Sequence, residues 1–376
     1  MRGHRQRTQG SGRGARRAGA PRAHPSRSRG GTEAHRIVKI LLVGFGVVGK
    51  ALALLLEGQR AALYARHGFS PALVGVIDSR GAAFDDAGLD PEALLAAKER
   101  HGTVGALPSR GLEGVQDVEL IAQSDAQVVI EATPTSVACP TAALSRLKAA
   151  FRTGKHVVCV NKGPLAVAFP ALLELARHNR VELRFSGTVG GGTPMLAFAT
   201  ECTRGSKVRA LRAVLNGTTN FILWRMEREG EGFEAALAEA TRLGYAERDP
   251  SADVDGVDAA TKLVILANGV LGRPCSLADV SIAGIREVSR EWIDRARGQG
   301  RVVKLIAELE RGLSVGPREI PADSPLNVPA SLNALCVELE SGGEMTLVGR
   351  GAGGPETATA IVRDLIDVWH AQGGRA

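Results

Sequence analysis

The sequence is poor in cysteine, and no two of its cysteines lie close together in the chain. Its 376 residues hold five Cys, an odd number, widely separated and without a C-x-x-C pair. Disulfide frameworks and zinc sites need cysteines in matched number or at short spacing, so the sequence predicts neither. Free thiols are the usual state in a reducing cytosol, and we therefore expect a cytoplasmic protein.

Long apolar runs are missing as well. No run in the chain approaches the roughly 20 residues that a membrane-spanning helix needs. Residues 1–36 also lack the apolar segment of a secretory signal. The sequence thus predicts neither a membrane span nor a secretory leader.

Acidic residues are nearly absent from residues 1–36, which hold ten Arg and one acid, Glu33. Outside this N-terminal tail, the rest of the chain contains 37 basic and 39 acidic residues. Its net charge is therefore −2, although that of the whole chain is +7. The tail is rich in Gly, Ser, Pro and Arg and has almost nothing apolar to bury, which predicts disorder. A transit peptide, a start codon assigned too far upstream and an RNA-binding arm remain alternatives. The rest of the chain is not basic, and no specific nucleic-acid partner is expected.

A glycine motif follows the first apolar run, residues 37–43. It fits G-x-G-x-x-G, with the sequence Gly44-Phe45-Gly46-Val47-Val48-Gly49. The apolar run predicts a buried parallel strand, and a helix is expected from about Lys50. In this setting Gly44 makes the tight turn, Gly46 admits a pyrophosphate, and Gly49 allows close packing of helix on strand. The motif therefore predicts dinucleotide binding at a helix N-terminus.

The second expected strand, residues 72–77, ends at Asp78-Ser79-Arg80. An acid at this place usually holds the ribose hydroxyls of NAD, whereas a nearby Arg receives the 2′-phosphate of NADP. Because Asp78 and Arg80 are both present, the choice between NAD and NADP stays open.

Two later strands also end in polar residues. A strand over residues 126–130 runs into a turn that holds Thr133 and Thr135, and a strand over residues 156–160 ends in Asn-Lys162-Gly-Pro. Ligands bind at the carboxyl edge of open parallel sheets, so we expect Thr133 and Lys162 beside the cofactor or substrate. Residues 85–110 predict a helix and a loop.

Two motifs in the middle of the chain are rich in glycine or in small polar residues. The segment Val189-Gly-Gly191-Gly-Thr193 exposes backbone carbonyl groups, which suits a cofactor edge or a hard cation, and equally a hinge between domains. The segment Asn-Gly-Thr-Thr219-Asn precedes a helix expected over residues 221–229 and predicts a pocket for a carboxylate or phosphate.

The densest group of charges runs from Gly244 to Lys262. It contains one lysine at its end and five carboxylates, Glu247, Asp249, Asp253, Asp255 and Asp258. Pro250 excludes one continuous helix, so we expect a loop followed by a helix over residues 257–269. On that helix Asp258 and Lys262 lie four residues apart on one face. Because four apolar residues follow Lys262, this face is predicted to be partly desolvated, as at sites that do chemistry.

These motifs, in this order, closely resemble homoserine dehydrogenase over roughly residues 37–370. The resemblance implies reduction of L-aspartate 4-semialdehyde to L-homoserine with NADH or NADPH, in threonine and methionine synthesis. It implies a Rossmann-type α/β domain joined to an α+β catalytic and dimerisation domain, in a short form without the family's ACT domain or a fused aspartate kinase. The run Gly349-Arg-Gly351-Ala-Gly-Gly resembles the family segment that returns to the cofactor.

The resemblance also assigns roles by motif position. Lys262 matches the proton donor, and Lys162 matches the lysine that positions substrate and cofactor. The substrate is expected at Glu247, Asp258, Asp253, Thr219 and Gly244. The cofactor is expected at Gly44, Gly46, Val47, Val48, Gly49, Asp78, Arg80, Thr133, Lys162 and Gly351. A sodium ion is implied at the carbonyls of Val189, Gly191 and Thr193, but Ser186 stands where the family usually has Glu.

We expect three segments: a tail at 1–36, a dinucleotide-binding domain at 37–185 completed by 346–376, and a catalytic and dimerisation domain at 186–345. Apolar strands at residues 301–309, 334–339 and 345–348 predict a homodimer. Two rival interpretations are a cysteine-dependent semialdehyde dehydrogenase and a redox-sensing regulator that binds NAD. The first needs an activated Cys beside a base, and no such motif is present.

Overall fold

The apolar run at the start of the folded chain forms the central strand of the first sheet, β1 (Ile37–Val43). The structure is a computed structural model that describes residues 37–114 and 116–374, so the predicted N-terminal tail lies outside the described residues. The first sheet has seven strands in the order β4-β3-β2-β1-β5-β6-β7. The remaining strands are β2 (Ser70–Ile77), β3 (Gly81–Phe84), β4 (Gly111–Glu113), β5 (Val128–Glu131), β6 (His156–Cys159) and β7 (Leu183–Arg184).

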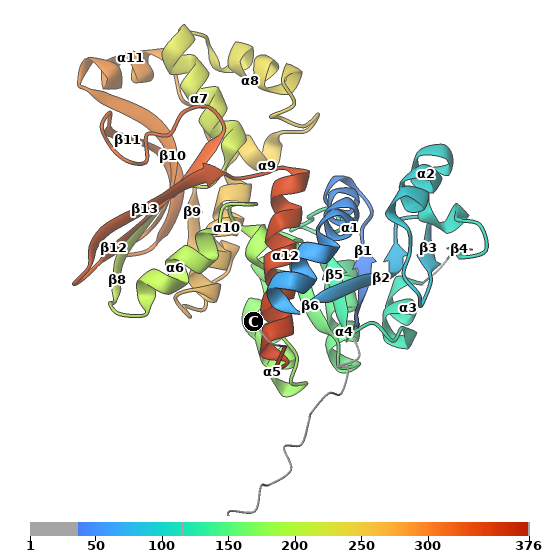
Figure 1. Ribbon diagram of the computed structural model, residues 1–376. Helices are drawn as coiled ribbons and strands as arrows, with labels where there is room; N and C mark the ends of the chain where they lie inside the picture. Colours follow the sequence, from blue (N-terminus) through green and yellow to red (C-terminus); the bar gives the residue numbers. More distant parts are fainter. Residues whose placement is uncertain (1–36, 115, 375–376) are drawn as a thin grey trace, which may run out of the picture. The chain divides into compact units, whose positions relative to one another are not determined.

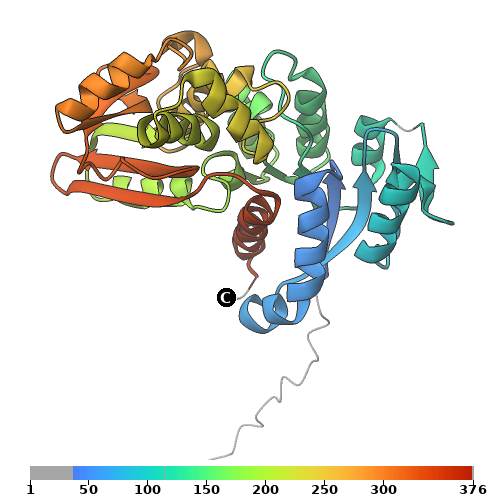
Figure 2. The ribbon, with the colours of Figure 1, turned by 90° about the horizontal axis from the view of Figure 1, so that it is seen from above.

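Five strands of this sheet are parallel, and helices cover both of its faces (Figures 1 and 2). One face packs on a core that includes Leu52, Leu94 and Ile361, which come from α1 (Val47–His67), α2 (Pro91–His101) and α12 (Gly354–Ala371). The other face packs on Ile121, Leu147 and Leu165, which come from α3 (Asp117–Gln123), α4 (Thr141–Arg152) and α5 (Lys162–His178). This is the doubly wound arrangement that the G-x-G-x-x-G motif predicts, so the predicted fold class is confirmed.

The second sheet has six strands in the order β13-β12-β8-β10-β11-β9. They are β8 (Val208–Val214), β9 (Val280–Ile282), β10 (Arg301–Leu309), β11 (Leu313–Pro321), β12 (Leu332–Leu339) and β13 (Gly343–Arg350). The helices of this region are α6 (Met195–Thr203), α7 (Gly217–Glu229), α8 (Phe233–Arg242), α9 (Ser251–Val254), α10 (Val257–Gly269) and α11 (Arg290–Gly298). Residues of α10 such as Leu263 share one apolar core with Leu305 and Leu335 of this sheet.

The end of the chain returns from the second sheet to the first. Strand β13 pairs with β12, and after Arg350 the chain enters α12, whose apolar face joins the core around α1. The Trp369 indole N–H donates to the carbonyl of His67 at 2.8 Å, which ties the end of α12 to the end of α1. The change from one sheet to the other therefore falls between β13 and α12.

The structure confirms several of the predicted helices and strands, and it contains others that were not predicted. Helix α10 has the predicted bounds, Val257–Gly269, and β10 also has the bounds predicted for it. Residues 162–164, expected as a turn, instead form the first turn of α5, because a proline in the first turn sacrifices no helical hydrogen bond. Strands β3, β4 and β11 and helix α6 have no counterpart in the sequence predictions.

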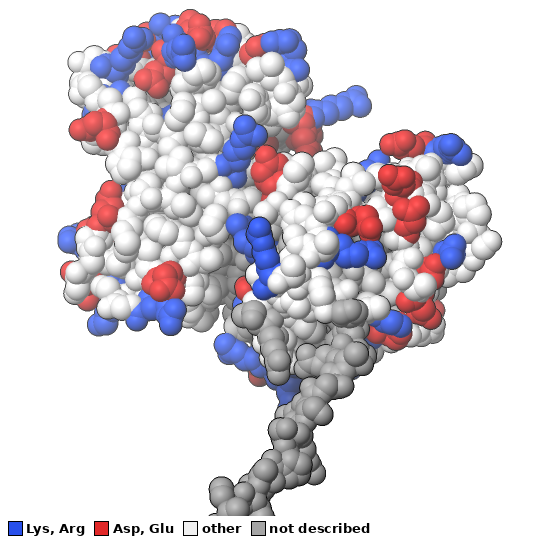
Figure 3. Space-filling model, viewed as in Figure 1, with Lys and Arg blue, Asp and Glu red and all other residues white. Residues whose placement is uncertain are grey.

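The surface of the described chain mixes both signs of charge. On the face drawn in Figure 3, Lys and Arg side chains alternate with Asp and Glu over both halves. This agrees with the near-neutral balance expected outside the N-terminal tail. No helix among the described residues combines the length and apolar composition needed to cross a membrane.

Candidate active site

A cleft of about 1380 Å³ opens at the carboxyl edge of the first sheet and reaches the helices of the second region. Its walls include most of the predicted site residues: Gly44, Gly46, Val47, Val48, Asp78, Thr133, Lys162, Gly244, Glu247, Asp253, Asp258, Lys262 and Gly351. Gly49, Arg80 and Thr219 lie close to it without being part of its wall. The structure thus brings together residues that are up to 307 positions apart in the chain, from Gly44 to Gly351.

The glycine turn has the geometry that its three glycines predict. Gly44 has a φ of +103°, and a Cβ there would lie 2.5 Å from the carbonyl oxygen of Ala132. A Cβ on Gly49 would lie 2.2 Å from the carbonyl oxygen of Gly44, so the helix packs directly on the turn. Gly46 has no heavy atom within 4 Å of the corresponding position and faces open space at the start of α1. The turn therefore leaves a cradle at a helix N-terminus, which suits a pyrophosphate.

The carboxylate of Asp78 is largely used inside the protein. Its side chain is 2% exposed and pairs with the Lys98 ammonium group at 2.7 Å. It also accepts hydrogen bonds from the Thr103 hydroxyl and from the backbone N–H groups of Arg80, Gly81 and Val104. Burial raises the pKa of Asp78, but Lys98 and these N–H groups outweigh burial and hold the pKa below its ordinary value.

Arg80 and Lys98 take different positions around this turn. The Arg80 guanidinium donates to the carbonyl of His101 at 2.6 Å, on the exposed side of the turn. Lys98 and Ser79 both line the cleft. Lys98 is a residue that the sequence did not suggest, because it lies within α2 in an ordinary charged helical pattern.

The two predicted catalytic lysines meet at one carboxylate. On α10 the Lys262 ammonium group lies 2.6 Å from Oδ2 of Asp258, the i,i+4 pair that the sequence predicts. Lys162, the first residue of α5, approaches Oδ1 of the same carboxylate at 3.5 Å. The Lys262 ammonium group also donates to the carbonyl of Leu215 at 2.7 Å. Lys262 is 8% exposed, so its side chain is held in a fixed, mostly dry position at the wall of the cleft.

The two partly buried aspartates of this group have opposite pKa shifts. Burial raises the pKa of Asp258, but the ammonium groups of Lys262 and Lys162 outweigh burial and hold the pKa well below its ordinary range. The pKa of Asp253 is raised, first by burial and then by the neighbouring negative charge of Asp258. Asp258 therefore lies as a carboxylate between two ammonium groups, and the pKa of Asp253 is the higher of the two.

Asn216 connects these aspartates and was missed as a site residue. Its amide Nδ2 donates to Asp253 at 2.6 Å and to Asp258 at 3.0 Å. Its Oδ1 accepts from the N–H of Thr219 and thus caps α7. The sequence identified the helix start but predicted a pocket for an anionic ligand. In the structure the side-chain amide of Asn216 donates its hydrogen bonds to the carboxylates of Asp253 and Asp258.

The other predicted substrate residues lie at different depths. Glu247 is exposed and borders the cleft, as does Gly244, which has a φ of +78°. Thr219 is fully buried, and its hydroxyl bonds to Asn216, whereas the neighbouring Thr218 lines the cleft. Thr218 donates to the carbonyl of Tyr245 and so holds the loop that carries Glu247.

The glycine segment around Val189 lies against the returning chain. Gly190 and Gly191 have positive φ, and a Cβ on Gly191 would lie 2.9 Å from the carbonyl oxygen of Gly351. The Thr193 hydroxyl donates to the carbonyl of Arg350 at 2.9 Å. The Ser186 N–H donates to the buried carboxylate of Asp364 at 2.8 Å. Among the described residues, no three His, Cys, Asp or Glu side chains gather around a common point that could hold a metal ion.

Two family models match the chain. Residues 44–186 match the family described as the homoserine dehydrogenase NAD binding domain, and residues 194–366 match the family described as homoserine dehydrogenase. The homoserine dehydrogenase of Methanocaldococcus jannaschii is 40% identical over 334 residues, which cover 88% of this chain and 98% of that protein. The NAD(+)-dependent homoserine dehydrogenase of Pseudomonas canavaninivorans is 37% identical and matches 88% of this chain and 96% of its own.

Solved structures agree with these relatives. A putative homoserine dehydrogenase from Archaeoglobus fulgidus superposes with a TM-score of 0.81 at 36% identity, covering 88% of this chain and 99% of that one. A hyperthermophilic archaeal homoserine dehydrogenase in complex with NADPH superposes with a TM-score of 0.78 at 30% identity, covering 89% and 98%.

Proposed function

The chain belongs to the homoserine dehydrogenase family, and on this premise we propose that the Lys262 ammonium group is the proton donor of the reaction. The enzymes of this family are NAD(P)-dependent oxidoreductases that interconvert L-aspartate 4-semialdehyde and L-homoserine, a step toward threonine and methionine. The observation that carries the proposal is the convergence of Lys262 and Lys162 on Asp258 inside the cleft that the glycine turn also borders.

The chemistry explains why an ammonium group is needed there. When bound, a nicotinamide cofactor would supply a hydride to the aldehyde carbon, and negative charge would then develop on the aldehyde oxygen. Lys262 donates a proton to that oxygen, and its own charge stabilises the developing alkoxide. Asp258 fixes the Lys262 ammonium group in place through an ion pair of 2.6 Å. Lys162 stands on the other side of Asp258 and positions substrate and cofactor.

The carboxylates at the cleft suit the α-ammonium end of the substrate. We assign that end to Glu247 and the hydroxyl end to Asp258, with Gly244 and Thr218 completing the pocket. Oxidation of L-homoserine by the purified protein, followed through NADH and NADPH formation, tests the whole assignment. A protein that reduces neither cofactor with L-homoserine would contradict it.

The cradle at Gly46 fits the pyrophosphate of NAD(P), and we propose that Arg80 favours the 2′-phosphate of NADP. Arg80→Ala is expected to weaken NADP binding more than NAD binding, because only NADP would lose an ionic partner. Dissociation constants for both cofactors, measured by fluorescence titration, check this. Arg100→Ala is the control, since Arg100 is an exposed arginine of the same region that does not line the cleft. Equal losses for NAD and NADP in Arg80→Ala would show that Arg80 does not contact the phosphate.

A sodium site at Val189, Gly191 and Thr193 is a separate proposal. Oxygen ligands suit hard cations, and this turn, in which Gly190 and Gly191 have positive φ, carries backbone carbonyls with few side chains beside them. Ser186 supplies no carboxylate, so this site would rest on carbonyls alone. Replacing sodium chloride by tetramethylammonium chloride at equal ionic strength is expected to lower the melting temperature. An unchanged melting temperature would argue against the site.

We propose a homodimer that forms through the second sheet. One face of this sheet packs on helices, whereas the opposite face carries a smaller apolar group that includes Ile306 and Cys336. Val348 of β13 is 44% exposed. Light scattering at micromolar concentration is expected to give twice the monomer mass, with Val348→Glu shifted toward monomer. Leu54→Glu, on an exposed position of α1, should leave the mass unchanged. A monomeric wild type would refute the proposal.

The remaining assignments follow from the same premise. We propose a cytoplasmic enzyme, with a dinucleotide-binding domain at 37–185 completed by 346–376 and a catalytic and dimerisation domain at 186–345. The strand pairing of β13 supports a boundary nearer to Arg350 than to residue 346, since residues 346–350 pair with β12.

A further inference from the structure

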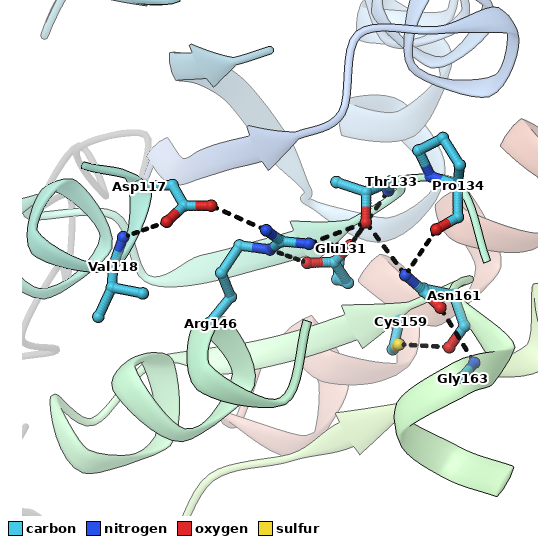
Figure 4. Close-up of polar contacts among 9 residues, drawn as sticks. All are labelled: Asp117, Val118, Glu131, Thr133, Pro134, Arg146, Cys159, Asn161 and Gly163. Carbon is cyan, nitrogen blue, oxygen red and sulfur yellow. Dashed lines mark hydrogen bonds and ion pairs between the residues drawn. The ribbon is translucent and has the colours of Figure 1, made fainter. Parts of the chain in front are cut away.

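A buried ion pair lies beneath the cleft at the carboxyl end of β5. Glu131, the last residue of β5, is fully buried, and Arg146 of α4 is 8% exposed. The Arg146 Nε lies 2.6 Å from Oε2 of Glu131 (Figure 4). Removing two charges from water costs several kcal/mol per ion, so such a pair is a weak device for stability alone. Its position at the cleft calls for another explanation.

The guanidinium group of Arg146 has three different partners. Besides Glu131, its Nη1 donates to the carboxylate of Asp117 at 2.8 Å, and its Nη2 donates to the hydroxyl of Thr133 at 2.9 Å. Burial lowers the pKa of Arg146, but Glu131 and Asp117 outweigh burial and raise it. Arg146 is therefore a fixed planar cation whose three nitrogen atoms contact two segments of the chain, the start of α3 and the end of β5 with the residues that follow it.

The Thr133 hydroxyl is the next member of this network, and all of its hydrogen-bonding capacity is used. It donates to Oε1 of Glu131 and accepts from Arg146 and from Nδ2 of Asn161, the latter at 3.0 Å. A hydroxyl offers one donor and two acceptor sites, so Thr133 cannot rotate without losing a partner. Figure 4 shows the hydroxyl between the guanidinium and the amide.

Asn161 carries the connection to the start of α5. Its Oδ1 accepts from the N–H of Gly163 at 3.0 Å, which caps the helix, and its Nδ2 also reaches the carbonyl of Pro134. The N–H of the next residue, Lys162, donates to the hydroxyl of Thr135 at 3.2 Å. The backbone of Lys162 is thus held from two sides by the segment that Arg146 and Glu131 fix.

We propose that Arg146 is a positioning residue: through Thr133 and Asn161 it sets the place of the Lys162 ammonium group against Asp258. This inference rests on the role of Lys162 in the proposed function. It explains why the guanidinium is shared between a buried carboxylate and a cleft hydroxyl, since a merely structural pair needs no contact with Thr133. Asp117, Thr133, Arg146 and Lys162 line the cleft, so the network reaches the cleft wall at these four residues.

Arg146→Lys is the variant of choice, because lysine keeps the charge beside Glu131 but cannot reach three partners in one plane. Its kcat for L-homoserine oxidation is expected to fall about 10- to 100-fold, since small misplacement of a catalytic group has effects of this size. The dissociation constant for the cofactor should change less than about threefold, because Arg146 contacts no residue of the glycine turn, whose N–H groups would hold the pyrophosphate. Thr133→Val removes the hydroxyl but leaves the ion pair, and it should lower kcat in the same way. It replaces Arg146→Lys as the test if that variant folds poorly.

A double-mutant cycle separates positioning from general damage. In the Lys162→Ala background, Arg146→Lys should cause little further loss of kcat, because the group that Arg146 positions is already gone. Arg225→Lys is the control: Arg225 pairs with Glu231 and lies outside the cleft wall, and its kcat should match the wild type.

Two results would overturn the inference. One is a kcat for both Arg146→Lys and Thr133→Val within about twofold of wild type; the other is an equal loss of kcat from Arg146→Lys with and without Lys162. The kcat of the single variant Lys162→Ala distinguishes failure of the proposed function from failure of the positioning role of Arg146. If that variant retains wild-type kcat, the role of Lys162 in the proposed function has failed, and the positioning role of Arg146 fails with it.

Discussion

Lys262→Ala is expected to lower kcat for L-homoserine oxidation by about 10²- to 10⁴-fold, the usual contribution of a positioned general acid or base. The residue is 8% exposed, and its ammonium group is fixed by the carboxylate of Asp258 and the carbonyl of Leu215. A water molecule that replaced the side chain would be neither positively charged nor held in this geometry. The loss of transition-state stabilisation corresponds to about 3–5 kcal/mol.

The same variant should bind NAD(P)H almost normally, because Lys262 belongs to α10 and is not part of the glycine turn before α1. Loss of one partner of a buried pair also destabilises the fold, so kcat must be measured well below the melting temperature of the variant. Lys148→Ala, at an exposed position of α4, is the matched control and should keep wild-type kcat. If Lys262→Ala keeps more than about a tenth of wild-type kcat, far above what loss of a general acid allows, Lys162 becomes the candidate donor.

The sequence predicted those parts of the site whose geometry is local. The glycine turn depends on residues 44–49 and their immediate neighbours, and its three glycines have the contacts that a dinucleotide-binding turn requires. The pair of Asp258 and Lys262 follows from helical spacing alone. Both features are therefore visible in a short window of sequence.

Features that depend on tertiary contacts could not be predicted in the same way. Asn216 reaches Asp253 across 37 positions, and Lys98 reaches Asp78 across 20. Nothing in the sequence around Arg146 distinguishes it from the other arginines of the chain, since its importance comes from packing against the end of β5. Strand β11 was not predicted for a similar reason. Its C-terminal half contains polar residues and prolines, and it is a strand because it pairs with β10, not because of its composition.

The long helix α1 provides the sharpest test of the cofactor assignment, because it contains two glycines in opposite environments. A Cβ on Gly49 would lie 2.2 Å from the carbonyl oxygen of Gly44, a backbone atom that cannot move without opening the turn. A Cβ on Gly58 would have no heavy atom within 4 Å, and the residue is exposed. An added methyl group would therefore clash with backbone atoms at Gly49 but would extend into solvent at Gly58.

Gly49→Ala is expected to weaken NAD(P)H binding about 10- to 100-fold and to destabilise the fold by about 1–3 kcal/mol, since overpacking has effects of this size and here displaces the N–H groups of the cradle. Gly58→Ala should instead stabilise the fold by about 0.5–1 kcal/mol, because alanine replaces an exposed glycine inside a helix. Cofactor titration and denaturant unfolding of both variants measure these effects. If Gly49→Ala binds NAD(P)H as tightly as Gly58→Ala does, the turn is not held by helix packing, and the pyrophosphate cradle must be assigned to another part of the cleft.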